Sequence, residues 1–279
     1  MGRLDGKVAV VTGGSSGIGE ASARLFHAEG ASLVIADIRD DRGEALAREL
    51  GPRASYVHCD VSTEADVKAA VDHALARFGG LDVMFNNAGI AGAVGGVEEV
   101  TVEAFDRTLA VNLRGVFLGV KHAAPTMKRR GRGSIINTAS VAGIRAGYGN
   151  HVYSAAKAAV IQFTRSVAME LGEHGVRVNC VLPGFIPTPM IGLARGLSAE
   201  EAEEKLRVVE EAFTGAQPIR GPGAPVDVAR AALWLASDDS AFVNGHALVV
   251  DGGASGGRMW STYQEAVVGL EERLRERTL

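Results

Sequence analysis

The chain has 279 residues, of which 47% are hydrophobic and 22% charged, so one domain can bury a sizeable core beneath an ordinary polar surface. The formal net charge is -4, and no block of like charge occurs. Because a nucleic-acid groove normally needs a basic face, we expect no nucleic acid among the partners.

The two cysteines, Cys59 and Cys180, end or cross apolar runs and lie outside any cluster of His or Cys. This predicts two buried, unpaired thiols in a reducing compartment, and no metal site. No apolar stretch with a small-residue cleavage site opens the sequence, and no apolar run approaches the ~20 residues that cross a bilayer. We therefore expect a cytoplasmic protein without a membrane partner.

Short runs rich in Val, Ile and Leu alternate with longer helical patterns along the chain. They lack strict alternation of apolar and polar residues, which is typical of parallel strands covered by helices on both faces. The runs are 8–11, 32–36, 55–59, 83–85, 134–137, 177–182 and 247–250. The pattern predicts an α/β fold: a single doubly wound, Rossmann-type domain with a seven-stranded parallel sheet.

Helix starts are marked by two expected capping boxes, Thr63 with Asp66 and Ser198 with Glu201, and by Pro225 in a first turn. Between residues 188 and 217 the pattern is broken by proline and glycine and then resumes as one polar helix, 199–213. We interpret this segment as a substrate lid inserted into a dinucleotide-binding and catalytic domain of residues 1–257.

Residues 258–279 form a separate tail, whose apolar residues recur at helical spacing. This spacing predicts a helix that packs on another surface, in this chain or in a neighbouring subunit. The apolar residues are Trp260, Tyr263, Val267, Leu270 and Leu274.

A glycine-rich turn, Thr12-Gly13-Gly14-Ser15-Ser16-Gly17-Ile18-Gly19, follows the first strand and opens a helix. A dinucleotide-binding fingerprint requires this context, because the helix N-terminus offers free N–H groups to phosphates. Gly13 would permit the tight turn, Gly17 the approach of the pyrophosphate, and Gly19 the close packing of helix on sheet. The spacing is Gly-x-x-x-Gly-x-Gly rather than the usual Gly-x-Gly-x-x-Gly, and a turn without a ligand is the alternative.

Asp37 ends the second strand, where a carboxylate can accept both hydroxyls of an adenosine ribose and repel a 2′-phosphate. NADP sites usually supply a cation in the glycine turn or just past this strand, but Ser16 and Ile38 stand there, and Arg39 is one residue late. NAD is therefore the expected cofactor. A role of Asp37 in capping the next helix is compatible with this.

Tyr153 and Lys157 are four residues apart, on one face of an expected helix, and Ser140 ends the fifth strand. Hydride loss from a secondary alcohol requires removal of the hydroxyl proton, for which a tyrosine of pKa ~10 is a poor base at neutral pH. An ammonium beside the phenol would lower the pKa of Tyr153, and Ser140 can donate to the substrate oxygen. A Tyr-x-x-x-Lys pair alone is more often a solvated surface pair. The prediction of a catalytic pair therefore depends on the other motifs that accompany it in this chain.

With these companions the chain resembles the short-chain dehydrogenase/reductase family, up to about Gly253. The matching residues are Thr12-Gly13-x-x-x-Gly17-x-Gly19, Asp60-Val61, Asn86-Asn87-Ala88-Gly89, Asn112, Ser140, Tyr153-x-x-x-Lys157, and Pro183-Gly184 followed by Thr188. The resemblance implies catalytic roles for Asn112, Ser140, Tyr153 and Lys157. It implies cofactor binding by Gly13, Ser15, Ser16, Gly17, Ile18, Gly19, Asp37, Asp60, Val61, Asn87, Ala88, Gly89, Tyr153, Lys157, Pro183, Gly184, Ile186 and Thr188.

In the family, Asp60 and Val61 would flank the adenine, and Asn87 would brace the central sheet. Asn112 would hold a kink in its long helix and position a water beside Lys157. Taken alone, an Asn inside a helix more often bonds its own backbone.

Members of the family bury the substrate beneath the lid, which is apolar here: Met190, Ile191, Leu193, Leu197, Leu206, Val209 and Phe213. The opposite wall would contain Ile144, Tyr148, Asn150 and His151. The segments 58–61 and 115–124 are most similar to dehydrogenases of cyclic secondary alcohols, among them the secoisolariciresinol, xanthoxin and hydroxysteroid types. We therefore expect NAD-dependent oxidation of a medium-sized, largely apolar, cyclic secondary alcohol, or the reverse reduction.

Two alternatives stay open. The stretch Pro183-Gly184-Phe185-Ile186-x-Thr188 resembles 3-oxoacyl-thioester reductases, which act on ACP or CoA thioesters and generally use NADPH; Arg145, Arg195 and Lys205 are candidate cations for such a substrate. A non-catalytic, NAD-binding regulatory protein would have the same fold, although such relatives typically lose the tyrosine or the lysine. By family analogy, the long helices near 103–130 and 152–174 would pair subunits into a homotetramer.

Overall fold

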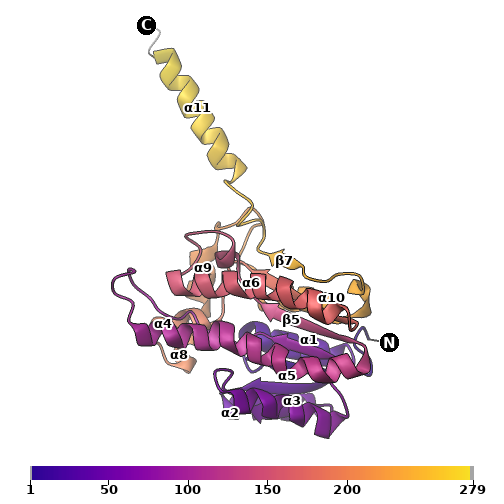
Figure 1. Cartoon of the computed structure of the whole chain (residues 1–279). Coiled ribbons are helices and arrows are strands. Elements are labelled where there is room, and N and C mark those ends of the chain that lie inside the picture. Colours follow the sequence, from indigo (N-terminus) through magenta and orange to yellow (C-terminus); the bar gives the residue numbers. More distant parts are fainter. Residues whose placement is uncertain (1, 277–279) are drawn as a thin grey trace.

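The computed structural model describes residues 2–276, whose centre is a seven-stranded sheet in the order β3-β2-β1-β4-β5-β6-β7, with every pair of neighbours parallel (Figure 1). The strands are β1 (Val8–Thr12), β2 (Ser32–Asp37), β3 (Ala54–His58), β4 (Val83–Asn86), β5 (Gly133–Thr138), β6 (Val176–Pro183) and β7 (Ala247–Val250). Each predicted run matches a strand to within one residue at either end, so the predicted fold class is confirmed.

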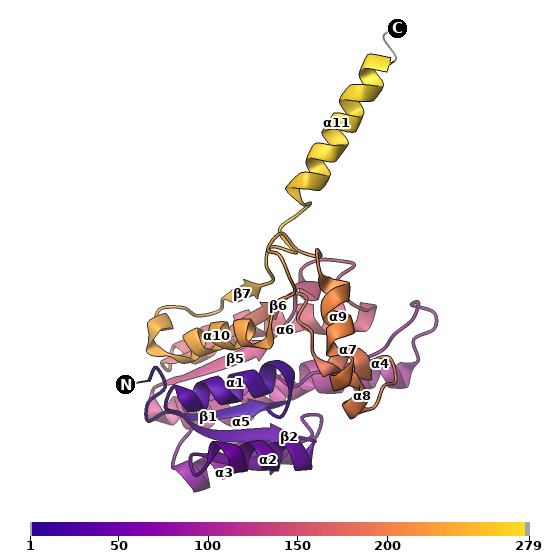
Figure 2. The same ribbon diagram turned by 180° about the vertical axis from the view of Figure 1, so that it is seen from behind.

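Helices cover both faces of the sheet, which is why the central strands are buried along their whole length. One apolar layer joins the sheet to α3 (Glu64–Phe78), α5 (Gly115–Arg130) and α6 (His151–Gly172), in front in Figure 1. The other joins it to α1 (Gly17–Ala28), α2 (Asp40–Leu50) and α10 (Pro225–Ala236), in front in Figure 2. Phe26 and Phe85 are fully buried in that layer with ring centroids 6.2 Å apart, and truncating either to Ala would cost about 3–5 kcal/mol.

The strand order reverses between β1 and β4, so the crossovers after these two strands run to opposite faces. In open parallel sheets this reversal leaves a crevice at the carboxyl ends of the strands, where ligands bind. The glycine turn follows β1 and the segment Asn87–Gly89 follows β4, which places both at this crevice.

The helix over residues 102–130 is interrupted, as expected, near Asn112. It consists of α4 (Val102–Leu109), one wide π-type turn (Ala110–Arg114) and α5. A π-type turn inserts one residue into an α-helix and often lies at a functional site.

Of the two expected capping boxes, the one at Ser198 is confirmed, with Ser198 and Glu201 exchanging side-chain and backbone hydrogen bonds of 3.2 and 2.9 Å. The one at Thr63 is wrong, because the Asp66 carboxylate instead accepts the N–H of Asp60 at 3.0 Å. Pro225 occupies the first turn of α10, as predicted.

The lid differs from the single helix expected over 199–213. It contains three short helices, α7 (Pro189–Leu193), α8 (Ala199–Glu204) and α9 (Leu206–Phe213), which lie together in Figure 2. The break at Lys205 lets α8 bury Ala202 against Gly192 of α7 while α9 directs Phe213 toward Phe185.

The tail forms the predicted helix, α11 (Trp260–Glu276), which stands away from the body of the molecule in both views (Figures 1 and 2). Much of its apolar stripe is exposed: Trp260 is 71% exposed, with its ring 5.3 Å from that of Tyr263, whereas Val267 is half-buried. Within this chain the stripe therefore does not pack on the core, in contrast to one of the two expectations. Among the residues described, no helix combines the length and the apolar character needed to cross a membrane.

Candidate active site

The glycine turn after β1 is a tight backbone cradle. Gly13 and Gly17 have φ of 62° and 50°, in the left-handed region that glycine adopts without strain. A side chain on Gly19 would collide with the carbonyl of Gly13, so α1 can begin this close to the sheet only with glycine there. Ser15, Ser16 and Ile18 lie between these glycines, and the first N–H groups of α1 face the crevice.

Asp37 lies at the end of β2, only 6% exposed, and faces the glycine turn. Its Oδ2 accepts the backbone N–H of Ser15 at 3.0 Å, and its Oδ1 accepts that of Arg39 at 3.1 Å. The carboxylate therefore braces the cradle. Each of its oxygens keeps a lone pair for a further donor.

Residues after β3 and β4 complete this side of the crevice. Asp60 accepts the N–H and the hydroxyl of Ser62 at 2.8 and 2.7 Å, and Val61 is buried beside it. Asn87 and Ala88 both donate their backbone N–H to Thr12 Oγ1, and Asn87 Nδ2 donates to the Thr12 carbonyl at 3.1 Å. Asn87 thus ties β1 to β4, which agrees with the bracing role that the resemblance implies.

Asn112, fully buried in the wide helical turn, binds the backbone of Ile90. Its Oδ1 accepts the Ile90 N–H at 3.0 Å, and its Nδ2 donates to the Ile90 carbonyl at 2.8 Å. The alternative that it bonds its own helix is therefore wrong. A Cβ on Gly89 would lie 2.9 Å from Asn112 Oδ1 and 3.6 Å from Lys157 Nζ, so these residues converge on one point.

Lys157 is 2% exposed and lies on α6 beside Tyr153, with Nζ 5.6 Å from the centroid of the phenol ring. Nζ donates to the carbonyl of Thr138, at the end of β5, at 2.7 Å. Ser140 follows the same strand and hydrogen-bonds to the Tyr153 hydroxyl. Ser140, Tyr153 and Lys157 therefore meet at the carboxyl edge of the sheet.

Burial controls the protonation of this pair. It lowers the pKa of Lys157 to about 8, and it raises the pKa of Tyr153 above its ordinary value, against the opposing effect of the Ser140 hydrogen bond. In the chain by itself the expected depression of the Tyr153 pKa by Lys157 is thus absent: desolvation raises the pKa, and the effect that opposes it comes from Ser140.

The segment after β6 forms another side of the crevice. Pro183 ends β6, and Gly184 packs so closely on Asp251 that a Cβ on it would lie 2.6 Å from the Asp251 Cβ. Ile186 and Thr188 are buried. A Cβ on Gly17 would lie 3.0 Å from Thr188 Cγ2, so the lid begins directly over the glycine turn.

An aromatic row joins the lid to the opposite wall. Phe185 stacks on Tyr148 with centroids 5.7 Å apart, and Phe213 of α9 lies 5.0 Å from Phe185. The Tyr148 hydroxyl donates to the carbonyl of Ala254 at 2.5 Å, which ties the row to the segment after β7. The sequence reasoning named Tyr148 and Phe213 but missed the contribution of Phe185 to this wall.

Two of the cations considered for a thioester substrate are engaged by backbone carbonyls. Arg145 Nε donates to Ser255 O at 2.8 Å, and Arg195 Nη1 donates to Ile191 O at 2.9 Å; Lys205 is exposed. Of the remaining wall residues, Ile144 and His151 are exposed, and Asn150 Nδ2 reaches the Ala91 carbonyl at 3.5 Å.

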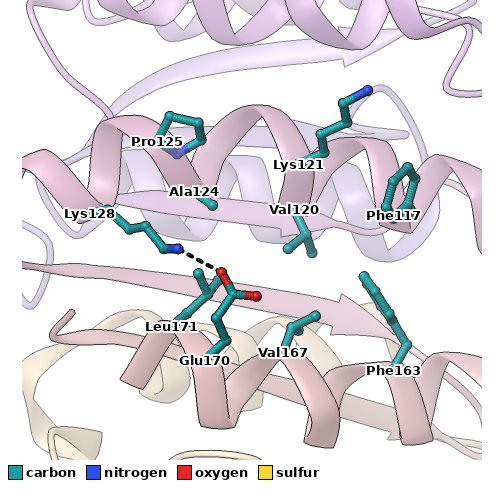
Figure 3. Close-up of a pocket in the computed structure, with 10 residues that line it drawn as sticks. All are labelled: Phe117, Val120, Lys121, Ala124, Pro125, Lys128, Phe163, Val167, Glu170 and Leu171. Carbon is teal, nitrogen blue, oxygen red and sulfur yellow. Dashed lines mark hydrogen bonds and ion pairs between the residues drawn. The ribbon is translucent and has the colours of Figure 1, made fainter. Parts of the chain in front are cut away.

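A separate groove lies between α5 and α6, with apolar side chains at its centre and the Lys128–Glu170 ion pair, 2.6 Å, at one end (Figure 3). None of the predicted site residues lines this groove. The residues that line it are Phe117, Val120, Lys121, Ala124, Pro125, Lys128, Phe163, Val167, Glu170 and Leu171.

Known proteins share this architecture. A family model described as Enoyl-(Acyl carrier protein) reductase matches residues 13–255. Momilactone A synthase of Oryza sativa subsp. japonica is 52% identical over 257 residues, 91% of this chain and 91% of that protein. Secoisolariciresinol dehydrogenase of Forsythia intermedia is 43% identical over 256 residues, 91% of this chain and 90% of that protein. The crystal structure of levodione reductase matches with a TM-score of 0.83 at 38% identity, covering 91% of this chain and 100% of that one.

The chain therefore belongs to the short-chain dehydrogenase/reductase family. It is an oxidoreductase of CH–OH groups that uses a nicotinamide cofactor and a small-molecule substrate. The alternative of a non-catalytic regulatory protein is wrong. The residues present fit a dinucleotide, because the left-handed backbone of Gly13 and Gly17 and the close packing at Gly19 let α1 begin at the carboxyl edge of the sheet, where its first N–H groups can bind a pyrophosphate.

Proposed function

We propose that this protein transfers a hydride between NAD(H) and a medium-sized, largely apolar, cyclic secondary alcohol or its ketone. The observation that carries the proposal is the meeting of Tyr153, Ser140 and buried Lys157 at the carboxyl edge of the sheet. This is the edge where a parallel sheet binds ligands.

In the proposed site, residues at the carboxyl edge of the sheet would hold the dinucleotide. Asp37 would accept hydrogen bonds from the adenosine ribose, Asp60 and Val61 would flank the adenine, and the glycine turn would hold the pyrophosphate. Asn87, Ala88 and Gly89 would line the nucleotide, and Pro183, Gly184, Ile186 and Thr188 would contact its nicotinamide end. The buried carboxylate of Asp37 supports NAD, because a 2′-phosphate there would be repelled.

The chain's own residues handle the proton. Ser140 donates to the substrate oxygen and positions it, and Tyr153 removes the hydroxyl proton during oxidation. When bound, a nicotinamide cofactor would supply the hydride acceptor for oxidation and the hydride donor for reduction. Lys157 holds a proton beside the phenol and hydrogen-bonds the nicotinamide ribose, while Asn112 positions a water that links Lys157 to solvent.

The cationic ring of an oxidised nicotinamide would stabilise the Tyr153 phenolate, against the desolvation that raises its pKa in the chain alone. The phenol is therefore matched to its task only when cofactor is present. This supports an ordered reaction in which the cofactor binds first.

The substrate class rests on the lid and on the relatives. The row Tyr148–Phe185–Phe213 offers flat apolar surface to a ring system, and the half-buried Met190, Leu197 and Val209 extend it. The relatives named for momilactone A and secoisolariciresinol support a cyclic substrate.

The test is the change in NADH absorbance on a panel of cyclic alcohols, steroids, terpenoids, lignans and 3-hydroxyacyl thioesters, with the full chain. Replacing the base by Tyr153→Phe should lower kcat/KM by about 10³-fold, since general acid–base catalysis contributes on that order. The matched control, Tyr263→Phe on the exposed α11, should leave the rate unchanged. A Tyr153→Phe variant that keeps wild-type activity would refute the proposed chemistry.

The second candidate is a 3-oxoacyl-thioester reductase; the description of the matching family model likewise names an acyl-carrier-protein substrate, but for reduction of an enoyl group. Against it stand the engagement of Arg145 and Arg195 by backbone carbonyls and the acidic Asp37. A strong preference for NADPH together with turnover of a 3-oxoacyl thioester would establish this candidate in place of the first.

The proposed enzyme is a cytoplasmic homotetramer. Buried, unpaired Cys59 and Cys180 support a reducing location. The groove between α5 and α6 supports pairing of these helices with those of a second copy, because Phe117 is 45% exposed and lies beside apolar side chains at the centre of the groove (Figure 3). Light scattering that returned a monomer at micromolar concentration would exclude the assembly.

A further inference from the structure

A cluster of four charged residues joins the lid to the end of β2. Arg39 Nε lies 3.9 Å from Asp37 Oδ1, and Arg39 Nη1 lies 3.8 Å from Glu203 Oε1 on α8. Arg42, one turn further along α2, forms an ion pair with the same Glu203 oxygen. Two cations next to the proposed ribose site are thus neutralised by one carboxylate of the lid and one of the sheet.

The inner part of this cluster is closed to solvent. Both terminal nitrogens of Arg39 are fully buried and make no hydrogen bond to the described residues; Oε1 of Glu203, which pairs with Arg42, is fully buried as well. Buried guanidinium nitrogens normally have hydrogen-bond acceptors. The Arg39 guanidinium therefore keeps unused donors beside the position where a 2′-substituent of the ribose would lie.

The position of Glu203 is fixed by the lid rather than by the sheet. It lies on α8, which begins with the Ser198–Glu201 capping box and packs Ala202 against Gly192 of α7. Lys205 ends this helix two residues later, and from the last turn of α8 the Glu203 carboxylate reaches both arginines.

We propose that Glu203 is a specificity-determining residue for the cofactor: it occupies Arg39 and Arg42 and so withholds them from the 2′-phosphate of NADP. This rests on the proposed use of NAD. Arginine is the residue that accommodates a 2′-phosphate in sites of this fold, and a phosphate ester carries close to two negative charges at neutral pH. With Glu203 present, a 2′-phosphate meets Asp37 and a neutralised pair of arginines; without it, two cations face the phosphate.

The direct test is binding of adenosine 2′,5′-bisphosphate and of AMP to the full chain, measured by calorimetry on the wild type and on Glu203→Gln. Glutamine keeps the size of the side chain and removes its charge. The dissociation constant of the bisphosphate should fall about tenfold, the order expected for freeing a close charge pair, while that of AMP stays within about twofold. The kcat/KM ratio of NADP to NAD should rise by the same factor.

The matched control is Glu204→Gln, which removes the neighbouring exposed carboxylate of the same helix and should leave both constants unchanged. Introducing Arg39→Met into Glu203→Gln should abolish the gain, because the freed cation is then gone. If Glu203→Gln does not fold, Glu203→Ala takes its place. The thermal unfolding transition of each variant shows whether it is folded.

Each result decides one statement. A wild type that prefers NADP would refute the proposed NAD function itself. A wild type that prefers NAD, with an unchanged ratio in both Glu203 variants, would refute the role of Glu203 alone. Equal losses of affinity for AMP and bisphosphate would show that Glu203 only holds the lid, and would overturn the inference as well.

Discussion

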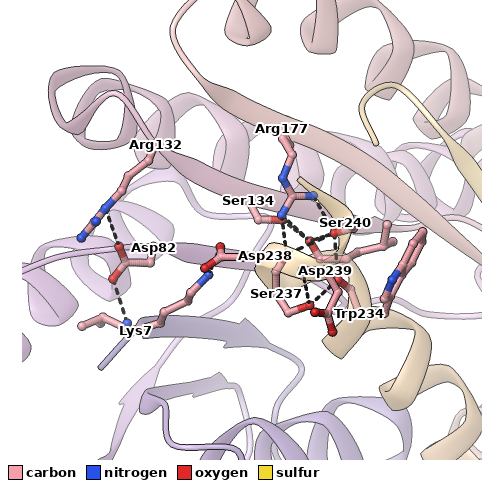
Figure 4. Close-up of polar contacts among 12 residues, drawn as sticks. Lys7, Asp82, Arg132, Ser134, Arg177, Trp234, Ser237, Asp238, Asp239 and Ser240 are labelled. Carbon is pink, nitrogen blue, oxygen red and sulfur yellow. Dashed lines mark hydrogen bonds and ion pairs between the residues drawn. The ribbon is translucent and has the colours of Figure 1, made fainter. Parts of the chain in front are cut away.

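The two edges of the parallel sheet differ in how fully they satisfy the hydrogen-bond donors of a partly or fully buried cation. At the amino edge, Arg177 donates to Ser240 Oγ at 2.9 Å and to the carbonyls of Leu235 and Ser237 at 2.8 and 3.0 Å (Figure 4). At the carboxyl edge, the described residues accept one hydrogen bond from Lys157, through Thr138 O, although an ammonium has three donors.

The same contrast extends to neighbouring groups. At the amino edge, Asp82 accepts the Val8 N–H at 3.0 Å and pairs with Arg132, and Ser134 Oγ donates to Leu235 O at 2.7 Å (Figure 4). Asp82 also pairs with Arg130. At the carboxyl edge, the buried hydroxyl of Ser15 has no partner in the described part of the chain. A satisfied polar network holds strands together, whereas unused donors and acceptors facing a crevice are suited to a ligand.

The largest effect is expected at Lys157. Replacement by Met should lower kcat/KM by about 10³-fold and, at the same time, raise the free energy of unfolding at pH 7 by about 2 kcal/mol, because a desolvated charge is removed. Chemical denaturation and steady-state rates measure both quantities. Lys68→Met, which removes an exposed ion pair on α3, is the control. If Lys157→Met lost both activity and stability, the proposed difference between the two edges of the sheet would be wrong.

Arg177→Met should have the reverse effect: a loss of stability without a loss of activity. It removes three hydrogen bonds of a partly buried guanidinium, so the free energy of unfolding should fall by about 2–3 kcal/mol while kcat of the folded enzyme is unchanged. Arg48→Met, which removes an exposed pair with Glu44, should change stability by less than about 0.5 kcal/mol. A large fall in kcat would show that the two edges are not independent.

The smallest expected effect is on the pH dependence of the free energy of unfolding, to which Lys157 and the two cysteines contribute with opposite signs. Its pKa falls from 10.5 in the unfolded chain to about 8 in the folded one, so between these values the unfolded state binds more protons and stability rises with pH. Burial raises the pKa of Cys59 to about 12 and that of Cys180 to about 11, which acts in the opposite direction above pH 9.

The useful quantity is therefore the difference in unfolding free energy between Lys157→Met and the wild type. It should be largest near pH 7 and shrink steadily as the pH approaches 10.5, because the wild-type amine becomes neutral in both states. A difference that stays constant across this range would mean that the Lys157 ammonium is not destabilised by burial.

The sequence predicted the carboxyl edge well because its residues follow strands directly. Asp37, Ser140 and Pro183 each end or follow a parallel strand, and the topology alone gathers them at one edge. The glycine spacing likewise reflects local geometry that no other residue can adopt.

What the sequence did not predict depends on contacts between distant segments. The partner of Asn112 is Ile90, reached only when the wide helical turn folds against the segment after β4. The lid helix breaks at Lys205 because Ala202 and Phe213 pack on different partners. The pKa of Tyr153 follows from burial, which the i, i+4 spacing with Lys157 does not reveal.

The wide turn Ala110–Arg114 has a consequence for how this region tolerates change in length. Each helical residue advances the chain by about 100°, so deleting one residue from the turn would restore a regular helix and rotate all of α4 by that angle relative to α5. Asn112 would leave Ile90, and the buried face of α4 would turn toward water. Substitutions on the outer surface of this helix are therefore far milder events than an insertion or deletion of a single codon within it.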